Sequence, residues 1–215
     1  MAKKYKVPII ADEVYEDMVF AGHEYIPLAQ LSQQSPAELN IPILTCSGLG
    51  KRFLVPGWRF GWIGVHEAPG WDLSMIRKGL FDLSTLIIGS NTLVQWALPE
   101  IFANTEDGFF KRINKQLEIN AAVVADRLCQ IPQLTVKRPQ GTMYMLVGFD
   151  FTRFKDLQTD VQVYEALLQE ESVVVLPGSI FGAKGYVRVV FCASEEHLLE
   201  ACNRIQQFCR RHQLS

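Results

Sequence analysis

Two side chains suited to covalent catalysis each follow a short apolar run. Asp12 comes directly after the run Val7–Ala11, and Lys51 comes six residues after the run Ile41–Thr45. In open α/β sheets, ligands bind outside the carboxyl ends of the strands, where both side chains would lie. A lysine amine attacks a carbonyl group when burial or neighbouring cations lower its pKa. We therefore expect Lys51 to be a Schiff-base former; the alternative is a solvated lysine on a surface turn.

Three more polar side chains lie close to Asp12 or Lys51 in the sequence. Tyr15 follows Asp12 by three residues and faces the same cavity, unless it is a core tyrosine. Arg59, eight residues after Lys51, is a cation that can grip a phosphate, and Ser47 offers a hydroxyl donor to the same group. Asp12 itself either accepts a hydrogen bond from a protonated ring nitrogen or serves as an N-cap.

Two further arginines differ in their surroundings. Arg188 lies inside the apolar run Tyr186–Phe191, where a lone cation is costly unless it is paired. Its partner is either a buried carboxylate of the protein or a substrate carboxylate held as a bidentate pair. Arg52, next to Lys51, is expected to be a solvated surface charge.

Alternating apolar runs and amphipathic stretches predict the elements that position these residues. The stretch Cys46–Trp62 is rich in glycine and holds Pro56, which favours an ordered loop over a helix. Strands are predicted at 7–11, 41–45, 62–65, 134–136, 143–147, 173–176 and 186–191. Helices are predicted at 27–33, from Asp72 to Ile87, at 92–102, at about 106–128, at 159–171 and from Ser194 to about Arg211.

The predicted elements divide the chain into two domains of an α/β protein. Residues 1–110 have the apolar strands of a parallel sheet, and residues 111–215 have the pattern of a small α+β domain, with the helix at about 106–128 as connector. Nothing precedes the first apolar run, so we expect the chain to hold the second half of a sheet. Half a sheet exposes a strand edge and apolar helix faces, which predicts aggregation or a partner chain.

Composition excludes several classes of function. Apolar residues make up 48%, charged residues 20%, and the net charge of −2 disfavours a nucleic-acid or anionic-membrane partner. No apolar run reaches the about 18 residues of a membrane span. The five cysteines lack CxxC spacing, which points to a reducing compartment, the cytoplasm, and places Cys202 and Cys209 in an apolar core. The four histidines are scattered, so no metal site is expected.

Three motifs in order resemble a known enzyme family. They are IADEVY at Ile10–Tyr15, KRFLVPGWRFGW from Lys51, and LPGSIFG ahead of Arg188. Together they resemble the fold-type I pyridoxal-phosphate aminotransferases of class I/II, over nearly the whole chain. The lysine loop, with the stretches Asp17–Phe20 and Pro139–Tyr144, looks most like the tyrosine-specific members of that family.

The resemblance implies a role for each candidate residue. Lys51 would bind pyridoxal phosphate covalently and then move the proton at the substrate carbon. Asp12 would pair with the pyridinium nitrogen and Tyr15 would donate to the ring oxygen. Ser47 and Arg59 would bind the phosphate. Arg188 would bind the α-carboxylate that the amino donor and the 2-oxo acid acceptor share.

The resemblance also implies the reaction and shows two departures. The reaction would move the amino group of tyrosine, or of a related aromatic amino acid, to 2-oxoglutarate, within a homodimer of the full-length form. Many relatives place serine three residues before the lysine, where this chain has Gly48. Family members are about twice as long, and the half that is missing here supplies part of the cofactor pocket. Alternative readings are therefore a truncated inactive fragment, or an alanine or broad-specificity aminotransferase.

Overall fold

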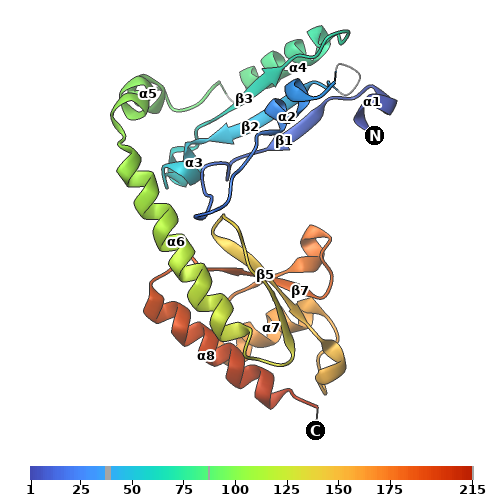
Figure 1. Ribbon diagram of the computed structural model, residues 1–215, viewed down its shortest axis with the longest axis vertical. Coiled ribbons are helices and arrows are strands. Elements are labelled where there is room, and N and C mark those ends of the chain that lie inside the picture. The colour runs from blue at the N-terminus through green and yellow to red at the C-terminus, as the bar shows by residue number, and fades with distance from the viewer. Residues whose placement is uncertain (37–39, 87, 215) are drawn as a thin grey trace. The chain divides into compact units, whose positions relative to one another are not determined.

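The chain has an α/β fold made of two compact units. A computed structural model describes residues 1–36, 40–86 and 88–214, and the units are Met1–Lys111 and Arg112–Ser215. Figure 1 shows a sheet with flanking helices in each unit. Ile87, which the sequence predicts at the end of a helix, lies outside the described residues.

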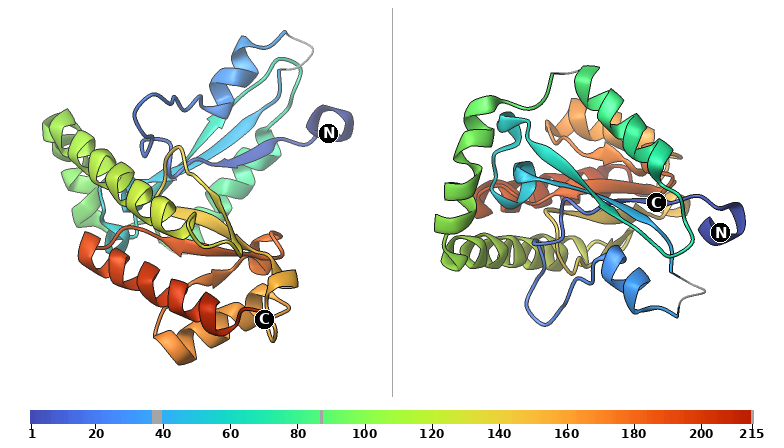
Figure 2. Two further views of the ribbon diagram at one scale, coloured as in Figure 1. Left: turned by 60° about the horizontal axis from the view of Figure 1, so that its bottom comes forward. Right: turned by 90° about the horizontal axis from the view of Figure 1, so that it is seen from above.

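The first unit is built on a three-stranded mixed sheet. Its order is β1-β2-β3, and its strands are β1 (Ile9–Asp12), β2 (Ile43–Gly48) and β3 (Gly61–His66). Its helices are α1 (Ala2–Tyr5), α2 (Leu28–Gln34), α3 (Leu49–Arg52), α4 (Ser74–Leu86), α5 (Thr92–Asn104) and the first turn of α6 (Asp107–Leu128). Figures 1 and 2 show α2 and α4 on opposite faces of this sheet.

The pairing of the strands agrees only in part with a parallel sheet. β1 pairs parallel with β2, whereas β2 pairs antiparallel with β3. The segment between β2 and β3 contains no crossover helix long enough to return the chain to the same end of the sheet, and a short connection leaves the next strand antiparallel. The three strand positions predicted from the sequence are confirmed within a few residues.

The lysine stretch is not wholly a loop, so that prediction was wrong. Leu49–Arg52 forms one helical turn, α3, and Pro56–Trp58 forms a short 3-10 helix. Leu49 is completely buried and Phe53 nearly so, and the Phe53 backbone N–H donates to the Leu49 carbonyl oxygen at 3.0 Å. Burying two apolar side chains four residues apart favours a helical turn there, despite the neighbouring glycines.

Helix α4 has apolar side chains among its polar and charged ones, but none of its described residues is buried. It begins at Ser74 rather than at Asp72, whose Oδ1 accepts from the Ser74 N–H at 2.9 Å. Phe81 and Leu86 are 70% and 75% exposed. In β1, which pairs only with β2 among the described strands, Ile10 is 71% exposed. The exposed strand edge and apolar helix faces expected of half a sheet are therefore present.

The second unit is built on a four-stranded antiparallel sheet. Its order is β4-β5-β7-β6, with β4 (Leu134–Lys137), β5 (Tyr144–Phe149), β6 (Leu176–Pro177) and β7 (Tyr186–Val190). Its other elements are the rest of α6, α7 (Asp160–Glu171), α8 (Glu195–Arg211) and the 3-10 helices Phe151–Arg153 and Gly178–Phe181.

The predicted strand 173–176 was mostly wrong. β6 has only two residues, because the preceding segment completes the end of α7. Ser172 adopts a left-handed conformation, and the Val173 N–H donates to the Leu167 carbonyl oxygen. A backbone donor used to end a helix is not available to a strand ladder. The starts of α7 and α8 are confirmed, with the Thr159 and Ser194 side chains as N-caps.

The core of the second unit contains one face of α6. Leu117 and Val124 are buried, and Asn120 is buried between them. The Asn120 side-chain amide donates to the carbonyl oxygens of Phe191 and Ala193 at 2.8 and 3.0 Å. These bonds tie α6 to the end of β7. Cys202 and Cys209 are buried in α8 as expected, and burial raises the pKa of their thiols to about 11 and about 12.

Candidate functional site

Parallel pairing of β1 and β2 brings Asp12 and Lys51, the two residues predicted to carry chemistry, to the same end of the sheet. Asp12, the last residue of β1, pairs in register with Cys46 of β2. The chain after β1 makes a turn that holds Tyr15, and the chain after β2 makes the helical turn that holds Lys51. The Lys51 Nζ lies 5.3 Å from the centre of the Tyr15 ring. Residues far apart in sequence thus form one cluster at the carboxyl ends of two strands.

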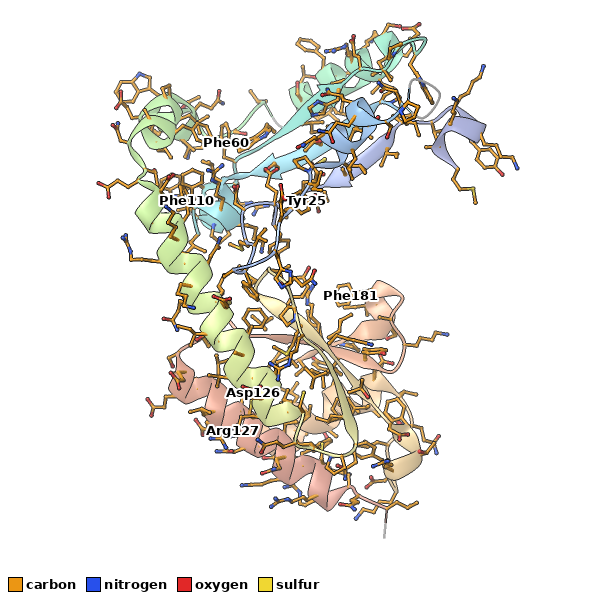
Figure 3. All side chains as sticks on the ribbon, viewed as in Figure 1. Tyr25, Phe60, Phe110, Asp126, Arg127 and Phe181 are labelled. Carbon is orange, nitrogen blue, oxygen red and sulfur yellow. The ribbon has the colours of Figure 1, made fainter. Side chains whose placement is uncertain are left out.

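The position of Lys51 is fixed by apolar residues on the other side of its helical turn. Leu49 and Phe53 are in a buried cluster with Val94 of α5. Phe60 and Phe110, labelled in Figure 3, pack against the same cluster. The Phe53 and Phe110 rings meet edge to face with centres 5.2 Å apart. A lysine on such a turn has little freedom in its backbone, which favours a fixed amine position.

Asp12 is exposed and keeps most of its capacity to accept hydrogen bonds. Its Oδ1 accepts from the Val14 N–H at 3.4 Å, which is a long bond. Both interpretations from the sequence are therefore compatible with the structure: the carboxylate supports the turn, and it has lone pairs left for a ring nitrogen. Glu13, the next residue, is buried, as alternation along a strand requires.

The two candidate phosphate ligands differ in how far their donors are already used. Arg59 is exposed, has left-handed backbone angles, and donates from Nη1 to the Pro56 carbonyl oxygen at 3.1 Å. Its remaining guanidinium donors are directed by a short 3-10 turn rather than by a flexible loop. Ser47 donates its hydroxyl to Glu16 Oε1 at 3.1 Å. Burial raises the pKa of Glu16, while the bond from Ser47 lowers it.

Arg52 is not the free surface charge that the sequence suggested. It forms a salt bridge with Asp17 at 3.2 Å. Its guanidinium carbon lies 4.7 Å from the centre of the Phe110 ring and 5.5 Å from that of Phe53. Arginine stacks readily on aromatic faces, and this contact links α3 to the first turn of α6. The correction comes from Phe110, whose approach is not visible in the sequence.

Arg188 lies between two aromatic rings in the second unit. Its guanidinium carbon is 4.9 Å from the Tyr144 ring centre and 4.5 Å from the Phe181 ring centre. Its Nε is buried and has no hydrogen-bond partner among the residues that the structure describes. Within the described part of the chain, no carboxylate lies within salt-bridge distance of Arg188. The alternative in which a protein carboxylate neutralises Arg188 is therefore not supported by the described residues. The alternative of an external carboxylate stays a prediction.

The candidate residues belong to different units. Those that lie in the first unit are Asp12, Tyr15, Ser47, Lys51 and Arg59, and Arg188 lies in the second. Sequence reasoning missed three residues next to this cluster: Glu13, Glu16 and Tyr25. Strand alternation after Asp12 was a signal that Glu13 is buried. Nothing in the sequence indicated that Glu16 meets Ser47, or that Tyr25 meets Glu13.

The described residues offer no alternative centre for metal or membrane chemistry. Across residues 1–36, 40–86 and 88–214, no group of three His, Cys, Asp or Glu side chains is placed to hold a metal ion. No helix in these same ranges is long and apolar enough to cross a membrane.

Comparison with known families settles which kind of protein has this arrangement. The family model for aminotransferase class I and II matches residues 1–205. The chain belongs to the class I and II aminotransferase family. Its α/β fold and its motifs agree with the resemblance found in the sequence. This family consists of enzymes, and it is one in which pyridoxal phosphate is the general cofactor.

Named relatives within the aminotransferase family include tyrosine aminotransferases. The chain is 43% identical over 212 residues to the tyrosine aminotransferases of Mus musculus and Homo sapiens. The match covers 99% of this chain but 45% of each relative. The chain therefore spans less than half the length of these enzymes.

Solved structures of aminotransferases also resemble this chain. The tyrosine aminotransferase of Leishmania infantum superposes with a TM-score of 0.90 at 32% identity, covering 99% of this chain and 51% of that one. The alanine aminotransferase of Pyrococcus furiosus gives a TM-score of 0.85 at 27% identity, covering 98% and 51%. The aminotransferase fold is thus clear, and the shared portion is again about half of the solved chain.

Proposed function

We propose that this chain carries the lysine-bearing part of a pyridoxal-phosphate site that transfers the amino group of tyrosine, or of a related aromatic amino acid, to 2-oxoglutarate. The observation that carries the proposal is the approach of Lys51 Nζ to the Tyr15 ring at the carboxyl ends of β1 and β2, beside the exposed Asp12. The names of the mouse and human relatives support the choice of tyrosine.

The side chains present fit the chemical groups of pyridoxal phosphate. Lys51 supplies the amine for the aldehyde carbon, and Asp12 has free lone pairs for the pyridinium nitrogen. Tyr15 supplies a phenol close to that amine, and Arg59 supplies an exposed cation for the phosphate. Ser47 is proposed as a phosphate donor only in a state in which its bond to Glu16 is released, so in the arrangement seen here Arg59 is the proposed phosphate ligand. When bound, pyridoxal phosphate supplies an electron sink for the substrate Cα.

The protein side chains then have distinct tasks in the reaction. Lys51 Nζ would take the proton from the substrate Cα and hold it for return later in the reaction. Asp12 keeps the ring nitrogen protonated by accepting its hydrogen bond. Arg188 binds the carboxylate that tyrosine and 2-oxoglutarate share, and the flanking Tyr144 and Phe181 rings hold its guanidinium plane.

The proposed partners and location of the protein follow from its interpretation as an aminotransferase. We propose that the full-length form is a homodimer, since family members place part of the site at a dimer interface. No nucleic-acid or membrane partner is proposed. All five cysteines are free in the structure, which supports a reducing compartment, and we place the protein in the cytoplasm.

A specific observation also favours an inactive fragment as a second candidate. The chain spans 45% of its mammalian relatives, and it exposes Ile10 on β1, Phe81 on α4 and Trp96, 85% exposed, on α5. Exposed apolar side chains on a strand edge and on helices mark surfaces that are normally covered. In this reading the 215-residue chain binds cofactor weakly until another polypeptide covers these surfaces. An alanine or broad-specificity enzyme differs from the first candidate only in the amino donor.

A pyridoxal-phosphate titration of the purified chain separates these candidates. We expect a saturable visible absorption band that is lost in Lys51→Ala and kept in Lys184→Ala, which removes an exposed lysine of the second unit. A band that survives in Lys51→Ala would contradict the proposal, because it would come from non-specific adducts with other amines. No band in any variant would favour the inactive fragment. Where the band forms, transamination assays with tyrosine and alanine identify the donor.

A further inference from the structure

Glu13 is a buried carboxylate next to the candidate site that the proposed reaction does not use. It is 4% exposed, although it directly follows the exposed Asp12. Its Oε1 accepts two hydrogen bonds at 2.8 Å, from the Tyr25 hydroxyl and from the Leu28 backbone N–H. A buried carboxylate is tolerated only when such donors replace the lost water.

Both donors come from the segment that follows the turn. Leu28 begins α2, whose N-cap residue, Pro27, has no side chain able to accept from a backbone N–H. Tyr25 lies three residues earlier and is labelled in Figure 3. Burial, and then the bond to Glu13, raise the pKa of the Tyr25 phenol to about 12, so it remains a donor at physiological pH. One carboxylate oxygen thus ties the end of β1 to the start of α2.

The backbone of Glu13 is also the point where β1 becomes the turn. Its N–H donates to the Cys46 carbonyl oxygen at 2.9 Å, which is the last rung between β1 and β2. Its carbonyl oxygen accepts from the Glu16 N–H at 3.0 Å, and the Tyr15 carbonyl oxygen accepts from the Met18 N–H at 2.9 Å. The turn that carries Tyr15 toward Lys51 therefore begins at a residue whose side chain is anchored elsewhere.

We propose that Glu13 is a positioning residue of the candidate site: its carboxylate, held by Tyr25 and Leu28, fixes the turn that presents Asp12 and Tyr15 beside Lys51. The inference rests on the proposed function for the identity of the ligand. Glu13 does not touch the cofactor in this account. It acts through the backbone on the two residues that do.

Replacement by glutamine tests the anchor with little change in shape. Oε2 of Glu13 is buried and has no hydrogen-bond partner in the described residues. Glutamine keeps one acceptor oxygen but places an amide NH₂ group where no acceptor lies, which weakens the anchor. Tyr25→Phe removes one donor and keeps the ring, so it is the milder variant if Glu13→Gln fails to fold. Glu24→Gln, at an exposed carboxylate beside Tyr25, is the matched control.

Two measurements on the folded 215-residue chain test whether Glu13 positions the turn. One of them does not depend on the cofactor. Hydrogen exchange at the Glu16 and Met18 amides reports the turn, and exchange at the Leu28 amide reports the start of α2. The dissociation constant for pyridoxal phosphate is measured well below each unfolding midpoint. We expect about tenfold weaker binding in Glu13→Gln, a smaller loss in Tyr25→Phe, and faster exchange at Glu16 and Met18 in both.

The outcomes distinguish a Glu13 that positions the turn after β1 from a Glu13 that only caps α2. Glu24→Gln should behave as the unmodified chain in both measurements. If only the Leu28 amide exchanges faster, and both variants bind pyridoxal phosphate normally, Glu13 merely caps α2 and the proposal is overturned. If the unmodified chain binds no cofactor, the proposed function fails, while the exchange at Glu16 and Met18 still decides whether Glu13 holds the turn.

Discussion

The Ser47 hydroxyl donates a hydrogen bond to Oε1 of Glu16 over 3.1 Å, and this bond joins the end of β2 to the turn after β1. A serine hydroxyl has a single proton to donate. While that proton is held by Glu16, Ser47 cannot also donate to a phosphate. Whether Ser47 can bind the phosphate of the cofactor therefore depends on this hydrogen bond to Glu16.

Replacing Ser47 by alanine should have little effect on cofactor binding. We expect the dissociation constant for pyridoxal phosphate to change by less than about twofold, because the lost donor is engaged with Glu16. Arg59→Ala should weaken binding by about tenfold or more, since a charge-assisted bond to the phosphate is lost. Titration of the visible band measures both constants. An equal loss in the two variants would show that Ser47 turns from Glu16 to the phosphate.

Replacing Glu16 by glutamine should change how stability depends on pH. Burial raises the pKa of Glu16, against the bond from Ser47 that lowers it, and the Asp17 and Glu13 charges add to the rise. The folded chain therefore holds this proton more tightly than the unfolded chain, so the contribution of Glu16 to stability falls as the pH rises through its folded pKa. Glutamine does not ionise, so its contribution to stability does not fall as the pH rises.

The expected result is a difference that grows with pH. The free energy of unfolding of Glu16→Gln minus that of the unmodified chain should be larger at pH 7 than at pH 4. Urea denaturation at several pH values measures it, with Glu24→Gln as a control at an exposed carboxylate. A difference that stays constant from pH 4 to pH 7 would mean that the surroundings of Glu16 do not favour its protonated form.

Gly48 should not tolerate serine, the residue that the family resemblance led us to expect three residues before the lysine. A Cβ atom at Gly48 would lie 2.7 Å from the Phe60 carbonyl oxygen and 3.0 Å from the Gly61 Cα, both of which are backbone atoms. The β2–β3 pair would have to separate. We expect Gly48→Ser to lower the free energy of unfolding by about 2 kcal/mol.

Gly57→Ser is the matched control for that substitution, because nothing lies within 4 Å of the position of its Cβ. Its effect should stay within about 0.5 kcal/mol. Urea denaturation monitored by circular dichroism compares the two. Equal stability of Gly48→Ser and the unmodified chain would show that the two strands separate there at no cost.

Phe181→Leu should weaken carboxylate binding at Arg188. The leucine keeps apolar bulk but removes the aromatic face 4.5 Å from the guanidinium carbon. A cation over a ring gains about 0.5–2 kcal/mol, so we expect 2-oxoglutarate to bind about two- to thirtyfold more weakly. Titration of the Arg188 Nε–H signal by NMR gives the constant. The control is Ile180→Leu, at an exposed neighbouring residue, which should bind 2-oxoglutarate as the unmodified chain does. An unchanged dissociation constant in Phe181→Leu would show that the Phe181 ring does not support binding at Arg188.

Local patterns in the sequence determined most of the elements. The apolar runs predicted β1, β2 and β3, and the spacing of apolar residues predicted α6 and α8. These signals depend on which face of an element is buried, and that periodicity is local. Motifs in the right order were enough to indicate the aminotransferase family, which the comparisons confirm.

Two errors in the prediction have different physical origins. The helical turn at Leu49–Arg52 forms because Leu49 and Phe53 enter a core completed by α5 and by Phe110, which lies far along the chain. Val173 joins the end of α7 instead of a strand because its N–H meets the Leu167 carbonyl oxygen. In the first case tertiary packing overrides the local propensity. In the second a local bond at the end of the helix uses the donor that a strand would need.

The sequence by itself singled out the candidates for chemistry, since Asp12, Tyr15, Lys51 and Arg188 are set apart by their type and by their place after or within apolar runs. Only the tertiary structure decided what each of them touches. Hydrogen bonds and ring contacts join residues tens of positions apart, as in the pairing of Ser47 with Glu16 and of Arg188 with Tyr144. Such contacts depend on strand register and on the direction of the chain after each strand, and neither quantity is encoded in the residues at the site alone.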